Sequence, residues 1–242
     1  VKDHTTLLAI LASIAVGVAQ FGSSVFLAQY FQVARGHTPT AAGLLMLPMV
    51  FGSMLGSAGS GAFITRTGEW KRPLILGSTL LLGGLLLMGT MDHTTTIWAL
   101  GGYMILVGLG TGMLMQNIVL VVQNTVDVSQ VGVASGVVTF FRSMGGAVGV
   151  AVLGAVLATS VHERIAEGLA KLGVPAGSTA GGNLDLKHMP APMVDLVRRS
   201  YADATGEIFL IAGLATVLTL ITVALMPRTE LRTTIEKVDT AD

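Results

Sequence analysis

The stretch TIWALGGYMILVGLGTGMLMQNIVLVV, from Thr96 to Val122, contains no Asp, Glu, Lys or Arg. A helix needs about 20 consecutive, mostly apolar residues to cross the hydrocarbon core of a bilayer. The stretch is long enough, and its apolar residues are continuous, whereas the strands of a membrane barrel alternate between apolar and polar positions. It therefore predicts a transmembrane helix.

Five further stretches have the same character, and the composition agrees with them. Of the 242 residues, 52% are hydrophobic and only 12% are charged, whereas soluble domains carry about 25% charged residues. The mean hydropathy is +0.73. The six predicted spans cover residues 5–33, 40–64, 73–91, 96–122, 132–159 and 206–226. The predicted fold class is an all-α integral membrane protein that forms a six-transmembrane-helix bundle.

Residues 160–205 differ from the spans. Val161, Ile165 and Leu169 recur at helical spacing among charged residues, which predicts a short amphipathic helix at the membrane interface. In the short loops and tails, Lys and Arg gather on one side, at positions 2, 66, 71, 72, 228, 232 and 237, against Arg35 on the other. The positive-inside rule then predicts a plasma (inner) membrane protein with both ends cytoplasmic. In this orientation, residues 160–205 are predicted to form an extracytoplasmic loop, and residues 227–242 are predicted to form a cytoplasmic tail.

Several classes of function find no support in the sequence. The formal net charge is zero and there is no cysteine, so neither a nucleic-acid surface nor a thiolate metal site is indicated. All five histidines fall in predicted loops or tails, which leaves no Ser–His pair at membrane depth. There is no P-loop pattern. We therefore expect no enzyme activity, no cofactor, no metal and no nucleic-acid partner.

Polar residues inside spans are costly and mark functional sites by default. In the first span, Ser13, Gly17, Gln20 and Ser24 follow one another at steps of four, three and four, which puts them on one helix face. That face is either a seam of hydrogen bonds between helices or the wall of a cavity. In the fourth span, Gln116 is the best single candidate for lining a substrate path.

Arg142 is the only charged residue within a span interior. It lies about 15 Å into the fifth span at the helical rise, where a charge must be paired or hydrated. We favour a snorkelling or structural role for it over substrate binding. No Asp or Glu lies well inside any predicted span, so the chain has no evident proton-coupling group; a missing N-terminal half could supply one.

Small residues recur at four-residue spacing on several spans, which favours close packing of helices in lipid. The pairs are Gly52 and Gly56, Ser53 and Ser57, Ser57 and Gly61, Gly108 and Gly112, Gly132 and Gly136, and Gly145 and Gly149.

The segment GAFITRTGEWKR, from Gly61 to Arg72, resembles the cytoplasmic motif of major facilitator superfamily transporters, Gly-x-x-x-Asp-Arg-x-Gly followed by basic residues. Thr65 stands where that motif usually has Asp. Residues 27–48 and 132–149 resemble, more specifically, the fourteen-helix drug:proton antiporter group, which contains multidrug and antibiotic exporters.

This resemblance implies that the chain is the C-terminal bundle of such a transporter, with helices nine to fourteen. In that family the first and fourth helices of each bundle line a central cavity, which implies a substrate path past Gln20, Ser24 and Gln116. It also implies a cytoplasmic gating motif, made of Gly61, Arg66, Gly68, Lys71 and Arg72. For these basic residues, plain positive-inside topology remains an equal alternative.

The expected function is proton-coupled export of amphipathic drugs, antibiotics or metabolites by alternating access. The expected partners are the small amphipathic substrate, protons, the lipid bilayer and the N-terminal bundle of the same transporter. Because the chain starts at Val1, we interpret it as a fragment. Two alternatives stay open: a six-helix membrane scaffold or partner protein without transport activity, and a homodimeric transporter built from two copies of this half.

Overall fold

The computed structural model describes residues 2–126, 128–171 and 191–226. Within these ranges every regular element is helical. The elements are α1 (Lys2–Gln29), the π-helical turn η1 (Tyr30–Ala34), α2 (Pro39–Leu45), α3 (Leu47–Thr67), α4 (Lys71–Gly89), α5 (Ile97–Thr125), the 3-10 turn η2 (Val128–Gln130), α6 (Val131–Lys171) and α7 (Ala191–Leu225). Six helical stretches are long and apolar enough to cross a membrane, which confirms the predicted all-α six-helix bundle.

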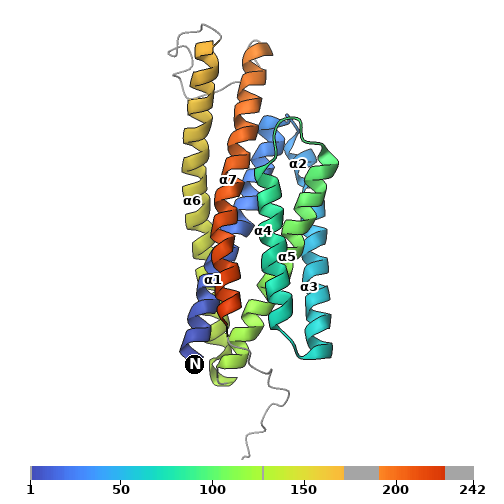
Figure 1. The fold of residues 1–242 in the computed structure, drawn as a ribbon, viewed down its shortest axis with the longest axis vertical. Coiled ribbons are helices and arrows are strands. Elements are labelled where there is room, and N and C mark those ends of the chain that lie inside the picture. Colours follow the sequence, from blue (N-terminus) through green and yellow to red (C-terminus); the bar gives the residue numbers. More distant parts are fainter. Residues whose placement is uncertain (1, 127, 172–190, 227–242) are drawn as a thin grey trace, which may run out of the picture.

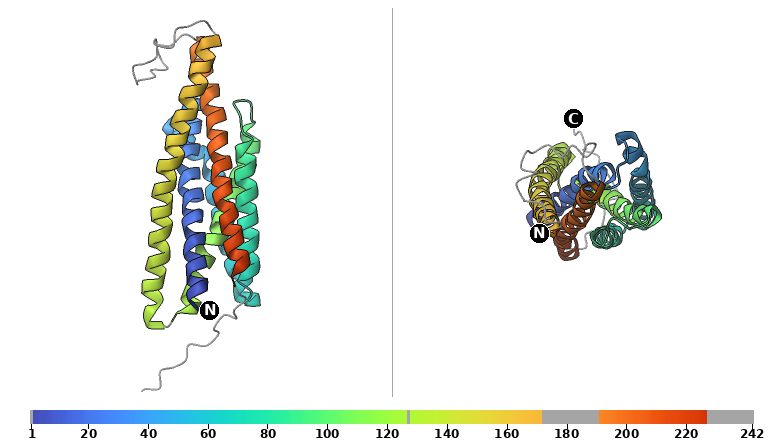
Figure 2. Two further views of the ribbon diagram at one scale, coloured as in Figure 1. Left: turned by 60° about the vertical axis from the view of Figure 1, so that its left-hand side comes forward. Right: turned by 90° about the horizontal axis from the view of Figure 1, so that it is seen from above.

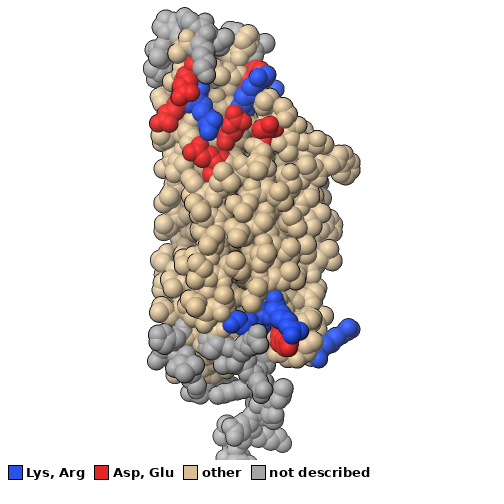
Figure 3. Space-filling view, in the orientation of Figure 1, with Lys and Arg blue, Asp and Glu red and all other residues tan. Residues whose placement is uncertain are grey.

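The long helices run along one axis, so the bundle has two ends (Figure 1). We call the end at which α1 begins the basal end and the opposite end the distal end. The connections from α3 to α4 and from α5 to α6 are basal, whereas those from α1 to α2 and from α4 to α5 are distal. On the face drawn in Figure 3, charged residues gather at the two ends, and the middle is free of them. That distribution suits a segment of bilayer thickness.

The helices are not equally enclosed. Helix α5 packs between α3 and α4, while α1 packs against α6, α7 and α5. Helices α3 and α6 therefore lie at the flanks of the bundle (Figure 2). In the most apolar window of each span, 17% of the α2–α3 span and 28% of α6 are buried, against 44–56% in the other spans. These two flanks present apolar surface that a second bundle or lipid must cover.

Glycines bring α3 and α5 into close backbone contact, as the spacing predicted. A Cβ atom added at Gly52 would lie 2.6 Å from the carbonyl oxygen of Ile105, and one at Gly108 would overlap the carbonyl oxygen of Met49. Gly56 and Gly112 make similarly close approaches across the same pair of helices. Only residues without a Cβ permit this separation.

The other small-residue pairs have mixed outcomes. Gly145 and Gly149 pack against α1, where a Cβ would come within 3.0 Å of Ile14 and Val18 respectively. A Cβ at Gly61, Gly132 or Gly136 would meet nothing within 4 Å. The four-residue spacing therefore predicted the α3–α5 and α1–α6 contacts, but it also marked Gly61, Gly132 and Gly136, which make no close contact within the described residues.

The structure corrects the expected interfacial helix in residues 160–205. Helix α6 continues without a break from the predicted span to Lys171, and residues 191–205 belong to the same helix as the sixth span. The amphipathic stripe faces α7 instead of a membrane surface: Ile165 and Leu169 are buried with Val197. Residues 172–190 and the predicted tail at 227–242 lie outside the described residues.

A cluster of hydrogen bonds joins the end of α1 to the α4–α5 turn. The Tyr30 hydroxyl, fully buried, donates to the carbonyl oxygen of Asp92 at 3.0 Å. Arg35 Nε donates to the Tyr30 hydroxyl at 2.9 Å, and its guanidinium also donates to the carbonyl oxygen of Thr95. Hydrogen bonds from Thr94 and Thr95 to the Asp92 carboxylate lower the pKa of this group to about 2. The cluster fixes the distal end of α1.

Candidate functional site

A first pocket lies between α1, α3 and α5 and has a volume of about 230 Å³. Gln20, Ser23 and Ser24 of α1 line it with Ser53 of α3 and Thr111 of α5. Several of these hydroxyls are bonded within their own helix; Ser24, for example, donates to the carbonyl oxygen of Gln20 at 3.0 Å. Gln20 Oε1 and Ser23 Oγ are buried and have no hydrogen-bond partner among the described residues. They are therefore available to a bound molecule or water.

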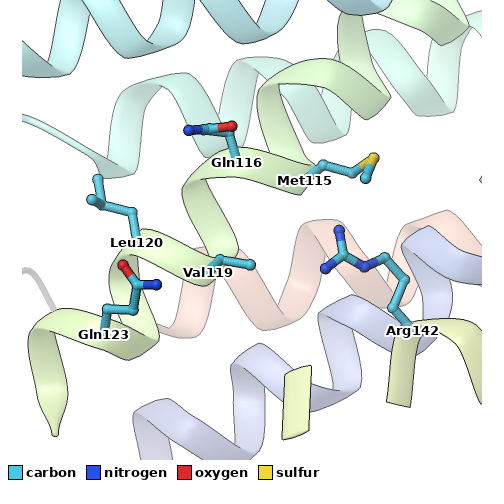
Figure 4. Close-up of a pocket in the computed structure, with 6 residues that line it drawn as sticks. All are labelled: Met115, Gln116, Val119, Leu120, Gln123 and Arg142. Atoms are coloured by element: carbon cyan, nitrogen blue, oxygen red, sulfur yellow. The ribbon is translucent and has the colours of Figure 1, made fainter. Parts of the chain in front are cut away.

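A second pocket, of about 290 Å³, lies between α5 and α6 (Figure 4). Helix α5 contributes Met115, Gln116, Val119, Leu120 and Gln123, and α6 contributes Arg142. The Gln123 amide is engaged, because its Nε2 donates to Ser135 Oγ at 2.8 Å. Gln116 is exposed. This pocket combines a guanidinium and an amide with an apolar wall.

The two pockets lie at successive levels along α5. Val107 and Thr111 line the first pocket, and Met115 and Val119 line the second. These four residues are spaced four apart, and each step advances about 40° around the axis at 3.6 residues per turn, so they follow a stripe that winds around α5 by about 120°. From Val107 to Val119 this stripe extends about 18 Å at the helical rise. Thr111 is its polar member, and the polar groups of the two pockets come otherwise from neighbouring residues such as Gln20, Gln116 and Arg142.

The structure divides the residues that were predicted to line one path. Gln20 and Ser24 share the first pocket, whereas Gln116 lies in the second. The small, polar face of α1 is also divided: Gly17 packs against the backbone of Arg142, and Ser13 is buried and donates to the carbonyl oxygen of Ala9 at 2.7 Å. Thus the face is a packing seam near Gly17 and a cavity wall from Gln20 onward.

Arg142 lies eleven residues after the start of α6 and is only 9% exposed. Its side chain extends toward α5 (Figure 4) and borders the second pocket. Within the part of the chain that the structure describes, the guanidinium makes one long hydrogen bond, 3.4 Å from Nη2 to Thr139 Oγ1. A buried position beside a pocket differs from snorkelling, which the sequence analysis favoured, together with a structural role, over substrate binding.

The predicted gating motif lies at the basal end. Gly68 ends α3 with a positive φ of 71°, and its N–H donates to the carbonyl oxygen of Ile64 at 2.8 Å. Arg66 is exposed, and Arg72 pairs with Glu69 at 2.9 Å. The hydroxyl of Thr65, at the position where Asp is usual, donates to the carbonyl oxygen of Gly61 at 2.9 Å.

Lys71 forms hydrogen bonds within this bundle. Its Nζ donates to the carbonyl oxygens of Ala224 at 2.8 Å and Met226 at 2.6 Å, at the C-terminal end of α7. A cation at this position satisfies terminal carbonyls and complements the helix dipole. Lys71 therefore ties α4 to α7, and Arg66 and Arg72 are the basic residues of the motif that remain exposed.

Sequence reasoning missed several pocket residues. It did not single out Ser23, Thr111, Met115 or Val119. The four-residue repeat from Val107 to Val119 could have marked the α5 residues that line the pockets, but mostly apolar residues at that spacing are also typical of a buried core. A polar residue within a span does not always line a pocket either. The Asn117 amide is buried, and neither of its side-chain polar atoms has a partner among the described residues, yet it borders neither pocket.

The fold and the pockets define a multi-pass helical membrane bundle with two pockets, each lined by polar and apolar residues, at successive levels of α5. Comparison with known proteins places this bundle in a family. The sequence pattern of the Major Facilitator Superfamily matches residues 1–150, more than half of the chain. The chain belongs to the major facilitator superfamily.

Two relatives illustrate the similarity. An uncharacterized MFS-type transporter of Mycobacterium tuberculosis is 35% identical over 205 residues, which cover 85% of this chain and 30% of that protein. A tetracycline resistance determinant of Streptomyces rimosus is 32% identical over 224 residues, which cover 82% of this chain and 65% of that protein. This chain thus spans between about a third and two thirds of the length of these relatives.

The fold also matches a solved structure. A bacterial homolog of the human lysosomal transporter Spinster, in an inward-facing and occupied conformation, superposes with a TM-score of 0.68. The sequences are 16% identical, and the match covers 92% of this chain and 49% of the other. At this identity the likeness concerns the fold, and it shows that one six-helix bundle corresponds to about half of such a structure.

Proposed function

We propose that this chain is one bundle of a proton-coupled efflux transporter, which exports amphipathic drugs, antibiotics or metabolites by alternating access. The observation that carries the proposal is the pair of pockets at successive levels of α5, each lined by both polar and apolar residues. A path for an amphipathic compound needs apolar walls and a few polar groups to orient the molecule. The relatives named for efflux or drug resistance support the direction and class of the cargo.

The transported compound would pass Gln20, Ser24 and Gln116, and an N-terminal bundle would complete the cavity. The apolar flanks of α3 and α6 give that second bundle a surface to pack against. Rocking of the two bundles would expose the path to either side of the membrane in turn. The described spans of this chain contribute no carboxylate to either pocket, so the proton-binding carboxylate would belong to the other bundle.

The proposed orientation puts the basal end in the cytoplasm, in the plasma (inner) membrane. Arg66, Lys71 and Arg72 gather there, as the positive-inside rule requires. Exposed Arg66 and Arg72 would contact the second bundle when the cytoplasmic gate closes, while Lys71 keeps α4 and α7 together. In this proposal the protein moves its cargo without chemical change, so it is not an enzyme.

Substitution of Gln116 by Leu in the full-length transporter tests the path. The amide is exposed in the second pocket, so the substitution removes a hydrogen-bonding group at no cost in buried polar atoms. One hydrogen bond contributes about 0.5–1.5 kcal/mol, so we expect transport of at least one compound in a panel to change by about two- to tenfold. Folding should be unaffected.

Efflux of ethidium, tetracycline and a neutral dye from cells is the measurement, with protein level checked by blotting. Gln32→Leu is the matched control, because the Gln32 amide donates to Ala28 of its own helix at 3.1 Å and borders neither pocket. Equal efflux of every compound by the wild type and the Gln116 variant would refute a role for Gln116 in the path.

A further inference from the structure

Arg142 is a buried cation that forms no ion pair with any residue that the structure describes. Among the described residues, the ion pairs join Arg72 to Glu69, Arg164 to Glu207 and Arg199 to Asp195. All of these pairs are exposed, and none includes Arg142. A guanidinium stays charged in proteins and is costly to bury without a partner. A negatively charged group bound in the pocket next to Arg142 would therefore be stabilised by the guanidinium.

The donors of Arg142 are largely unused. The guanidinium has five N–H groups in a planar fork, and the described residues accept only one long hydrogen bond from it, at Thr139 Oγ1. Such a fork matches the two oxygens of a carboxylate. Across the pocket, Met115, Val119 and Leu120 form an apolar wall, and the amide of Gln116 lies beside it (Figure 4).

We infer that the α5–α6 pocket binds the carboxylate of a transported organic anion through Arg142. The apolar part of the anion packs against Met115, Val119 and Leu120, and Gln116 offers a further hydrogen bond. The volume of about 290 Å³ suits part of a drug-sized molecule, and the second bundle would enclose the remainder. This inference rests on the proposed export function and names a substrate class for it: amphipathic carboxylates.

A matched pair of probes separates charge from shape. Dansylglycine carries a carboxylate, and dansylglycinamide has the same skeleton without the charge. The full-length transporter would be tested in two ways: export of each probe from energised vesicles, and equilibrium binding of each probe to the purified protein by dansyl fluorescence. Ethidium export serves as an independent measure of transport activity.

Arg142→Gln should weaken binding and export of dansylglycine about ten- to hundredfold, which is the usual effect of losing hydrogen bonds to a charged group. Dansylglycinamide and ethidium should change less than twofold. Arg142→Lys keeps the charge but loses the fork and should fall between the two. Arg164→Gln, an exposed arginine far from the pocket in sequence, is the control and should leave all three probes unchanged.

A second variant covers the case in which Arg142→Gln does not fold. Gln116→Glu adds a carboxylate to the same pocket, where it competes for Arg142, and should reduce dansylglycine binding while the neutral amide still binds. Equal loss of both dansyl probes in the Arg142 variants would overturn the inference, because it would mean that Arg142 pairs with a carboxylate of the second bundle or supports the fold. Wild-type protein that exports ethidium but neither binds nor exports dansylglycine would also overturn it.

The two proposals fail in different ways. Arg142-dependent binding of dansylglycine without export of any probe would refute the efflux function and retain the carboxylate site. Export of ethidium and dansylglycinamide without discrimination by Arg142 would retain the efflux function and refute the carboxylate site.

Discussion

The glycine contact between α3 and α5 makes a quantitative prediction about stability. A Cβ at Gly52 would lie 2.6 Å from the carbonyl oxygen of Ile105 and 3.1 Å from the backbone nitrogen of Leu109. Both neighbours are backbone atoms, so no side chain can rotate away. Ordinary van der Waals contact begins at 3.4 Å, and the helices would have to separate by roughly 0.8 Å. Overpacking of this kind costs about 1–3 kcal/mol.

Gly59→Ala is the matched control. It is the same substitution on the same helix, and a Cβ there meets nothing within 4 Å. Because Ala is a better helix former than Gly by about 1 kcal/mol, Gly59→Ala should be neutral or slightly stabilising, while Gly52→Ala destabilises by about 1–3 kcal/mol. Reversible unfolding in mixed micelles, followed by circular dichroism, measures both. Equal stability of the two variants would refute the close α3–α5 contact.

Two further predictions concern the distal hydrogen-bond cluster. Arg35→Gln removes the donor to Tyr30 and the charge beside it, and leaves the buried Tyr30 hydroxyl with fewer partners. We expect the free energy of unfolding to fall by about 1–3 kcal/mol in the same assay. Arg66→Gln, at an exposed site, is the control and should leave the free energy of unfolding unchanged. The pKa of Asp92 is lowered from 3.8 to about 2 in the folded protein, so its contribution to stability is present above about pH 4 and disappears as the pH falls toward 2. Unfolding measured between pH 2 and 5 should show a steeper loss of stability for the wild type than for Asp92→Asn, and parallel curves would contradict the role of the carboxylate.

The number and position of the spans could be predicted because each span must present a continuous apolar stretch, long enough to cross the hydrocarbon core, to the lipid. A stretch such as residues 96–122 has no alternative to a membrane helix once its length and apolarity are known. The start of α5 at Ile97 lies one residue from the predicted start, and its end at Thr125 lies three residues beyond the predicted end. Such differences follow from helices that extend past the hydrocarbon layer.

The extent of α6 could not be predicted in the same way. Val161, Ile165 and Leu169 form an apolar stripe among charges, and that pattern is equally typical of a helix on a membrane surface and of a helix paired with another. The partner, which includes Val197, lies about 30 residues further along the chain. Periodicity describes one helix face and does not identify what covers it.

The candidate site was predictable only in part, for a related reason. Gln20, Ser24 and Gln116 are polar residues in apolar stretches, and the sequence marks them as unusual. Gln20 and Ser24 lie on α1 and Gln116 lies on α5, so their division between two pockets depends on how these helices pack together, which the sequence does not specify. Likewise, the direction of the Arg142 side chain depends on how α6 is rotated about its own axis, which the sequence does not specify.

Helix α6 has a mechanical consequence. At the helical rise its 41 residues extend about 62 Å, roughly twice the thickness of a hydrocarbon core. Because the helix is so long, a tilt of 10° about a point at membrane depth displaces a residue about 30 Å from that point along the helix by roughly 5 Å. Pairs of spectroscopic probes on the distal turns of α6 would thus magnify small movements near Arg142 into distances that pulsed spin-resonance methods resolve.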